Sequence, residues 1–279
     1  MKPLRVIPPP YIQYLDEFFN SIELPYRQRL ARIRQRIVLR YQEYENKHRL
    51  DTLEALHAQT WIASQKEALL YCYDGDTVDV SVPRDTLINR IHQLQPAVSK
   101  EKCQYCMLSE PKSIDHFLPK SIFPEFAVLP LNLFPCCQYC NSKKFTFWRR
   151  NGSRRIINFA IDNVEVARFL YCEIEYDPRG ARVEFELRRH HSISPRLFGI
   201  IEGHFMRLGL FDRYKDAATG PISEAQSLLR NSFTGGFKFI RRSILLRHAN
   251  SQEEVYGINF WRAAVFRALA ESREFLRAD

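Results

Sequence analysis

The stretch from Cys103 to Phe145 reads CQYCMLSEPKSIDHFLPKSIFPEFAVLPLNLFPCCQYCNSKKF and holds five of the seven cysteines of the chain. The four letters CQYC stand at residues 103–106 and again at residues 137–140, with 30 residues between them. A Cys-x-x-Cys turn can present two thiolates to one cation, and two such turns complete the tetrahedral ligand set of zinc. The pairs therefore predict a structural zinc site that clasps a loop of chain.

The expected zinc ligands are the four cysteines of the two turns: Cys103, Cys106, Cys137 and Cys140. Cys136 could replace Cys137 as a ligand, although the matching CQYC frames favour Cys137. A redox role is the weaker interpretation, because two such pairs around an insert suit one shared metal better than disulfide exchange. Zinc held by four thiolates has no open coordination position. Any catalysis must therefore come from polar residues inside the clasp.

An ionisable pair, Asp115 and His116, lies inside the clasp between apolar neighbours. Taken alone, such a pair is most simply a satisfied buried ion pair. The alternative is that the two side chains line a cleft and that the apolar neighbours hold them there. The Pro119 that follows interrupts the extended chain and would allow both side chains to serve one site.

The run CQYC…IDHFLPKS…NLFPCCQYCNSKK resembles an HNH endonuclease of the zinc-clasped type, whose ββα-metal motif holds one divalent cation. An Asp-His pair, an Asn-Leu sixteen residues after the His and a Cys-Asn nine residues further follow in the order of that family. The resemblance covers about residues 103–145 and does not extend to the flanking regions.

The resemblance implies a role for four residues. His116 would be the general base, and Asp115 would be a ligand of Mg²⁺ or Mn²⁺. Asn132 would fix the loop and the imidazole. Asn141 stands at the third position of the motif, which is often His in the family, and would be a second metal ligand. These roles meet the needs of phosphodiester hydrolysis, which requires a proton acceptor for water and a cation at the phosphate.

Positive charge is concentrated around this motif. The chain has a net charge of +9, and residues 101–160 carry nine basic side chains against four acidic ones. Such a field suits a nucleic-acid partner. The expected phosphate contacts are Lys120, Lys143, Lys144, Arg149, Arg150, Arg154 and Arg155. The aromatic residues interleaved with them, Phe145, Phe147 and Trp148, are expected mainly in the core.

The pattern of the whole chain predicts an α+β fold that is mostly helical. We expect a helical region over residues 1–100, an HNH ββα-metal core with its zinc clasp over residues 101–150, and a β-hairpin plus helices over residues 151–279. Alternation on both sides of DPRGA (177–181) predicts the hairpin, with Pro and Gly in its turn.

Three further segments give local expectations. In residues 24–42, apolar positions at spacings of three and four predict a helix, and its many arginines form either a solvated face or a second nucleic-acid surface. Residues 73–83 are read as a loop with a short extended piece, followed by a helix. The last helix is expected over about residues 253–276, with Ile258, Trp261, Val265 and Leu269 on one buried stripe.

Taken together, the resemblance implies a metal-dependent endonuclease that cuts DNA and leaves 5′-phosphate and 3′-hydroxyl ends. The N-terminus does not resemble a secretory signal, so we expect a cytoplasmic protein. The layout of the chain also resembles HNH effectors of Septu-type anti-phage systems, which act beside an ATPase partner and are in some cases attached to retrons. Two alternatives stay open: a zinc-stabilised nucleic-acid-binding subunit without catalysis, and a nuclease that cuts RNA. No apolar run is long enough for a membrane span, so no membrane partner is expected.

Overall fold

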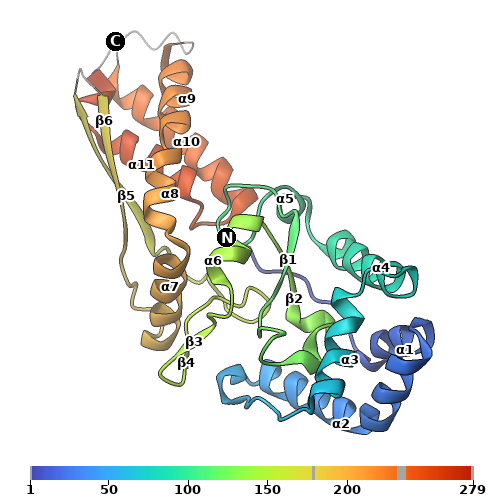
Figure 1. Cartoon of the computed structure of the whole chain (residues 1–279). Helices are drawn as coiled ribbons and strands as arrows, with labels where there is room; N and C mark the ends of the chain where they lie inside the picture. Colours follow the sequence, from blue (N-terminus) through green and yellow to red (C-terminus); the bar gives the residue numbers. More distant parts are fainter. Residues whose placement is uncertain (1, 178–179, 231–236, 278–279) are drawn as a thin grey trace. The chain divides into compact units, whose positions relative to one another are not determined.

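Figure 1 shows a computed structural model of the chain, which describes residues 2–177, 180–230 and 237–277. Its residues form two compact units, Pro3–Asp162 and Asn163–Asp279, the second of which also takes up the first two residues. Small antiparallel sheets in a mainly helical chain confirm the predicted α+β class. The finer division at about residues 100 and 150 stays a prediction, since it concerns how independently each part folds.

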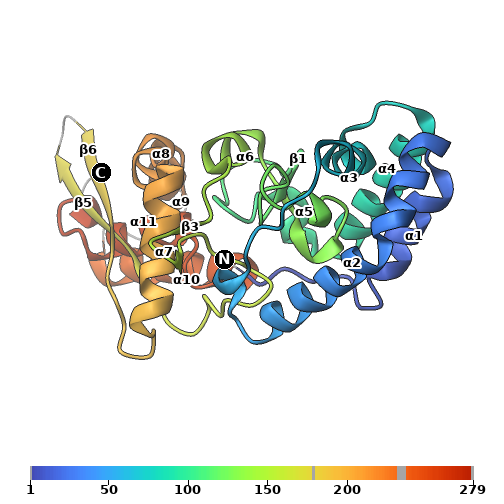
Figure 2. The ribbon, with the colours of Figure 1, turned by 60° about the horizontal axis from the view of Figure 1, so that its bottom comes forward.

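The unit Pro3–Asp162 begins with helices that pack against one another, and Figure 2 shows the first four gathered together. Their bounds are α1 Ile12–Ser21, α2 Leu24–Arg49, α3 Ala63–Asp74, α4 Val78–Leu94 and α5 Ala97–Glu101. The apolar stripe of α2 that the sequence predicts is buried, from Leu30 through Ile33 and Ile37 to Tyr41. Burial of this face, rather than helix propensity alone, explains why a helix so rich in arginine is stable here.

Three arginines of α2 pair with acidic side chains of the same unit. Arg29 contacts Glu67 at 2.9 Å, and Arg34 contacts Asp16 at 2.7 Å. Arg40 is buried and donates from Nε to Glu125 at 2.9 Å. These pairs favour the interpretation of α2 as a structural helix over that of a second nucleic-acid surface.

Residues 73–83 correct one expectation, because they are mainly helical rather than an extended loop. α3 runs through Asp74, and α4 already begins at Val78. The alternating valines of this stretch mimic a strand, but Val80 shares its buried face with Leu87 and Ile91, which follow at helical spacing. Packing of that face therefore overrode the local alternation.

The centre of this unit consists of two short strands and a helix. Their bounds are β1 Ser113–His116, β2 Leu133–Cys136 and α6 Gln138–Lys144, with 3₁₀ turns at Pro124–Phe126 and Pro130–Asn132. β1 and β2 are antiparallel, with Ser113 opposite Cys136 and His116 opposite Leu133. A small ribbon follows, β3 Arg149–Arg150 with β4 Ser153–Arg154. The strand–loop–strand–helix order matches the ββα unit that the sequence predicts.

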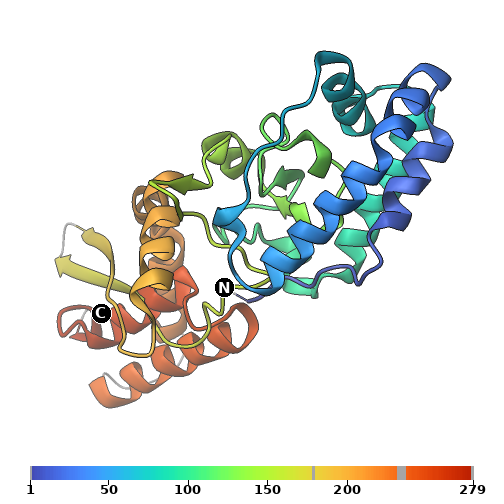
Figure 3. The same cartoon turned by 90° about the horizontal axis from the view of Figure 1, so that it is seen from below.

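The unit Asn163–Asp279 contains the predicted hairpin and a group of helices, as Figures 1 and 3 show. β5 Leu170–Asp177 pairs with β6 Gly180–Leu187 from Leu170↔Leu187 to Asp177↔Gly180, which confirms the hairpin. Its two tip residues, 178–179, lie outside the described part of the chain. The helices are α7 Pro195–Leu208, α8 Leu210–Ala217, α9 Thr219–Arg230, α10 Lys238–Tyr256 and α11 Trp261–Glu271.

The last predicted helix, residues 253–276, is wrong in its extent. α10 ends at Tyr256, where Gly257 takes φ 96°, and α11 starts only at Trp261, so Ile258 lies in the connection. Glycine adopts this dihedral without steric penalty and thereby ends the helix. Trp261, Val265 and Leu269 are buried on α11, as expected. None of the helices in the described ranges combines the length and apolar character that a bilayer span requires.

Candidate metal centre and polar pocket

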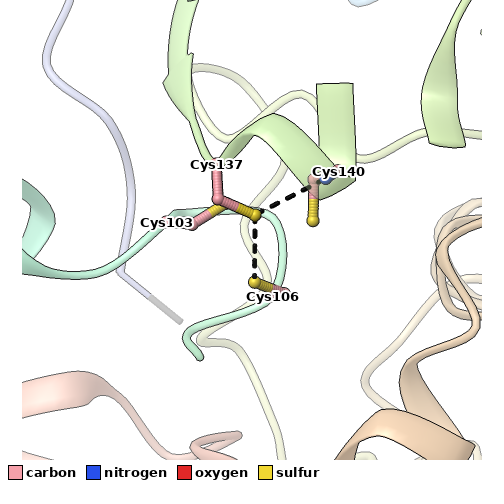
Figure 4. Close-up of side chains that lie close together, drawn as sticks. All are labelled: Cys103, Cys106, Cys137 and Cys140. Carbon is pink, nitrogen blue, oxygen red and sulfur yellow. Dashed lines mark hydrogen bonds between the residues drawn. The ribbon is translucent and has the colours of Figure 1, made fainter. Parts of the chain in front are cut away.

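The cysteines of the two CQYC turns come together in one cluster, which Figure 4 shows. Their sulfur atoms all lie within 4.8 Å of one another, and the side chains are buried. Cys106 Sγ and Cys137 Sγ are 3.8 Å apart. A Zn–S bond of about 2.3 Å implies a separation of about 3.8 Å between sulfurs in a tetrahedron. The cluster therefore fits one zinc ion, which would join the chain before β1 to the start of α6.

Local backbone geometry presents these sulfurs to one another. In the first turn, Met107 N donates to Cys103 O at 2.7 Å, and Met107 takes φ 56° as the chain folds back. In the second, Cys137 precedes α6 and its sulfur accepts from Cys140 N at 3.5 Å. Hydrogen bonds from the neighbouring thiols lower the pKa of Cys137 below its ordinary value. A readily deprotonated sulfur at this point suits metal ligation.

Cys136 is excluded from the cluster by the register of β2. It is the last residue of β2 and is buried, and burial raises the pKa of its thiol. Successive side chains of a strand point to opposite faces. Cys137 is the residue that reaches the other three sulfurs, so the structure favours the CQYC frame over the alternative with Cys136.

The loop between β1 and β2 is fastened by Asn132. Its Oδ1 accepts from Leu118 N at 2.7 Å, and its Nδ2 donates to Leu118 O at 3.0 Å and to Phe126 O at 3.2 Å. Tyr44 of α2 also donates to this amide oxygen, at 3.3 Å. Asn132 is fully buried, and these hydrogen bonds fasten the loop; its role in catalysis stays a prediction.

Asp115 is buried and its carboxylate has two partners. Tyr105 OH donates to Oδ2 at 2.7 Å, and Lys144 Nζ lies 3.0 Å from Oδ1 and 2.9 Å from Oδ2. The same ammonium donates to His116 O at 2.8 Å. The ion pair of Asp115 is thus formed with Lys144 at the end of α6, and not with the adjacent His116.

His116 has one ring nitrogen engaged by the protein. Nε2 lies 2.9 Å from Ala127 O, which can only accept, so Nε2 carries the proton of the neutral ring. Nδ1 is then the nitrogen with a free lone pair. Tyr73 packs edge-on against the imidazole, with 4.4 Å between ring centroids. Burial lowers the pKa of His116 from 6.5 to about 3, so the ring is neutral at pH 7.

Asp115, His116 and Asn141 line one pocket of about 320 Å³. The other lining residues are Pro119, Lys120, Ser121, Ser142, Phe145 and Thr146. Asn141 Nδ2 donates to Ser113 Oγ at 2.7 Å and to Ile114 O at 3.1 Å, which fixes the amide against β1. The fold thus brings together three of the four residues that the sequence proposed for catalysis, with Asn132 behind them.

The donors at this pocket are of the kind that Mg²⁺ or Mn²⁺ prefers. Asp115 offers carboxylate oxygens and Asn141 offers an amide oxygen, both hard ligands. Lys144 and Tyr105 already use part of the acceptor capacity of Asp115, which has about four lone-pair positions. The set fits a cation that keeps several waters, as Mg²⁺ usually does.

Two residues of the predicted phosphate-contact set are corrected by the structure. Lys144 is fully buried on Asp115, and Arg154 is 2 % exposed, with Nη2 at 2.7 Å from Asp162 and 2.6 Å from Asp51. Since both charges are already neutralised in the interior, neither side chain reaches a phosphate. Arg149 is half-buried and donates to Glu54 O at 2.8 Å.

The remaining members of that set stay candidates for phosphate contact. Lys143 and Arg150 are exposed, Arg155 is half-buried, and Lys120 lines the pocket, where it pairs with Asp74. Among the aromatic residues, Trp148 is buried as expected, whereas Phe145 is 70 % exposed and contradicts the expected core position. The charge run in the sequence therefore mixes interior and surface residues.

Sequence reasoning missed Tyr105 and the structural role of Lys144. Tyr105 lies within the first CQYC turn and is fully buried, while its counterpart Tyr139 in the second turn is 45 % exposed. Both turns have the sequence CQYC, so the local sequence does not distinguish the buried tyrosine from the exposed one. For Lys144 a signal existed, because it stands on α6 three residues after Asn141, one helical turn from a proposed ligand.

We expect Lys144→Met to destabilise the unit Pro3–Asp162 by about 3–5 kcal/mol, because it leaves the carboxylate of Asp115 buried without its countercharge. Urea unfolding measures this change. Lys143→Met is the matched control, since the neighbouring Lys143 is exposed and should shift stability by about 0.5 kcal/mol or less. Equal shifts in the two variants would contradict the assigned role of the buried ion pair.

Two proteins resemble the chain over part of its length. It is 28 % identical to Protein ea31 of Escherichia phage lambda over 196 residues, which is 64 % of each chain. It is 34 % identical to Septu protein PtuB of Bacillus thuringiensis over 90 residues, which is 30 % of this chain and 34 % of that protein. The chain thus spans less than two thirds of either relative. No family model matches the sequence, and no solved structure matches it.

Proposed function

We propose that the chain is a metal-dependent endonuclease of the HNH class that hydrolyses phosphodiester bonds of DNA. The observation that carries this proposal is the pocket in which Asp115, His116 and Asn141 converge, next to the four-cysteine cluster. A buried ion pair alone would not need a neutral histidine with a free nitrogen and a neighbouring amide at the same opening. In this proposal the zinc site stabilises the fold, and the residues of the pocket carry out the hydrolysis.

In this proposal His116 takes a proton from the attacking water. Its Nε2–H is held by Ala127 O, which leaves Nδ1 as the proton acceptor and fixes the direction of its lone pair. Asn132 keeps the loop that carries Ala127 close to β1 through its bonds to Leu118 and Phe126. Asp115 and Asn141 would hold Mg²⁺ or Mn²⁺, which when bound stabilises charge on the phosphate and the leaving oxygen.

The similarity to Septu protein PtuB supports a role for the chain in anti-phage defence. We propose that it acts in the cytoplasm beside an ATPase partner, as the resemblance of its layout to Septu-type effectors implies. The alignment covers 30 % of the chain, so the role of the whole protein is part of the proposal. DNA is the substrate that the HNH resemblance implies. The exposed side chains Lys143 and Arg150 suit phosphates, which DNA and RNA share.

The direct test is plasmid cleavage by the purified, zinc-loaded protein. We expect nicked or linear DNA with Mg²⁺ or Mn²⁺ and none after addition of EDTA, because the divalent cation is required at the phosphate. A parallel reaction with RNA separates the two nuclease alternatives. Binding of DNA without cutting, in either metal and with the partner present, would favour the non-catalytic subunit instead.

A further inference from the structure

The pocket has an aromatic residue at its opening that neither the zinc cluster nor the proposed hydrolysis requires. Phe145 directly follows α6, lines the pocket that contains Asp115 and His116, and is 70 % exposed. An isolated exposed apolar residue is ordinary on a protein surface. Its position at the candidate site, however, sets it apart from the other large exposed apolar residues in the described part of the chain.

The backbone at Phe145 is held in a conformation that normally requires glycine. Its φ of 49° and ψ of −121° lie outside the regions that L-residues adopt without strain. The chain is fastened on both sides, since Phe145 N donates to Asn141 O at 2.8 Å and Phe147 N donates to Lys144 O at 2.9 Å. Strained residues of this kind gather at functional sites, where the surroundings hold them in place.

This backbone turn sends two neighbouring side chains in different directions. Lys144 is fully buried on Asp115, whereas Phe145 stands at the opening of the pocket. The anchored Lys144 therefore holds the backbone of Phe145 close to the candidate metal ligand. Lys120 lines the same pocket, and Lys143 is exposed one residue before Lys144.

An aromatic ring beside cationic side chains is the combination by which proteins hold single-stranded nucleic acids. The cations contact the phosphates, and the ring stacks on a base whose face is free. In an intact duplex both faces of each base are already covered by stacking, so the ring would have no partner there without distortion of the helix. A ring at this position would therefore select nucleic acids that have an exposed base face, whichever base that is.

We propose that Phe145 is a stacking residue that selects DNA with an unpaired base next to the scissile phosphate. The inference rests on the proposed function and narrows its substrate from DNA in general to single-stranded or locally unpaired DNA. Stacking on a base would cover a ring that the free protein leaves in water. The strained backbone would keep that ring at the pocket.

Binding to a single-stranded oligonucleotide that contains 2-aminopurine, without added divalent cation, tests this inference apart from catalysis. We expect Phe145→Ala to weaken single-strand binding about 5- to 150-fold, the range that corresponds to loss of one stacked base. Binding to the matching duplex should change less than about 2-fold. Phe145→Trp should retain single-strand affinity and quenching of the 2-aminopurine signal.

Two further variants separate stacking from a general effect on structure. Phe145→Gly should lose single-strand affinity without any fall in melting temperature, because glycine accepts this backbone conformation freely. Phe239→Ala is the matched control, since Phe239 is 80 % exposed on α10 and outside the pocket, and it should bind as the wild type does.

Equal single-strand affinity in Phe145→Ala and wild type would overturn the inference, as would equal losses on single strand and duplex. These outcomes are distinct from failure of the proposed function. If the plasmid is cut and the Phe145 variants bind normally, only the stacking role is wrong. If the Phe145 variants behave as expected and no nucleic acid is cut, the pocket binds unpaired DNA without hydrolysing it.

Discussion

Cleavage by the His116→Ala variant is expected to fall by about 10²- to 10⁴-fold, the contribution of a general base. The physical reason is the fixed tautomer of this imidazole: with Nε2–H on Ala127 O, Nδ1 is the one ring nitrogen that can accept a proton from water. Burial keeps the ring neutral at pH 7, so Nδ1 carries no proton before the reaction begins. Initial rates of plasmid nicking under saturating Mg²⁺ measure the effect.

The expected loss is informative only if the variant keeps its structure. His116 packs against Tyr73, so its removal leaves a small space. For this reason zinc content and thermal unfolding are measured together with activity. His190→Ala is the control, because His190 is exposed in the other unit and should cut at the wild-type rate. A His116→Ala protein that has lost its zinc or its thermal transition would remove the basis for the catalytic assignment.

Cys103→Ser is expected to have the largest effect on stability of any variant considered. Structural zinc contributes about 10–16 kcal/mol of apparent free energy in small domains, and three remaining thiolates cannot close the tetrahedron. We expect soluble yield and zinc content to fall together. The ratio of zinc to protein, measured by atomic absorption on the soluble fraction, and the unfolding transition of that fraction report the loss.

Cys136→Ser provides the matched control for this prediction. Cys136 is also a buried cysteine next to the clasp, but its sulfur is outside the four-thiol cluster. Its substitution should leave one zinc per chain and a modest loss of stability from a buried hydroxyl. Full zinc retention in Cys103→Ser, or zinc loss in Cys136→Ser, would show that the ligand set differs from the cluster.

The clasp was predictable from the spacing of residues along the chain. The two CQYC frames and the Asn-Leu and Cys-Asn steps between Asp115 and Asn141 are local patterns, and the fold brings these residues together in the expected strand–loop–strand–helix order. The hairpin of residues 170–187 was also predictable, because apolar and polar residues alternate along a strand that has one buried face. Zinc ligation and catalysis stay predictions.

Local patterns failed in two segments, for different reasons. The alternating valines before Pro83 resemble a strand, yet the packing of Val80 in the core makes that segment part of α4. The helix expected over residues 253–276 is divided because Gly257 takes a positive φ. The spacing of the apolar residues around Gly257 does not predict this break. In the first case burial overrode the pattern, and in the second a glycine at the end of α10 interrupted it.

By itself, the sequence determined which residues can bind metal and accept protons, because thiols, carboxylates and imidazoles have their chemistry wherever they lie. Only the tertiary structure decided which charges are neutralised inside the protein. Lys144 and Phe145 are adjacent in a run that looks uniformly basic and aromatic, yet one is buried on Asp115 and the other faces solvent at the pocket. The physical reason is that burying a charge requires a partner, and that partner lies 29 residues away in sequence.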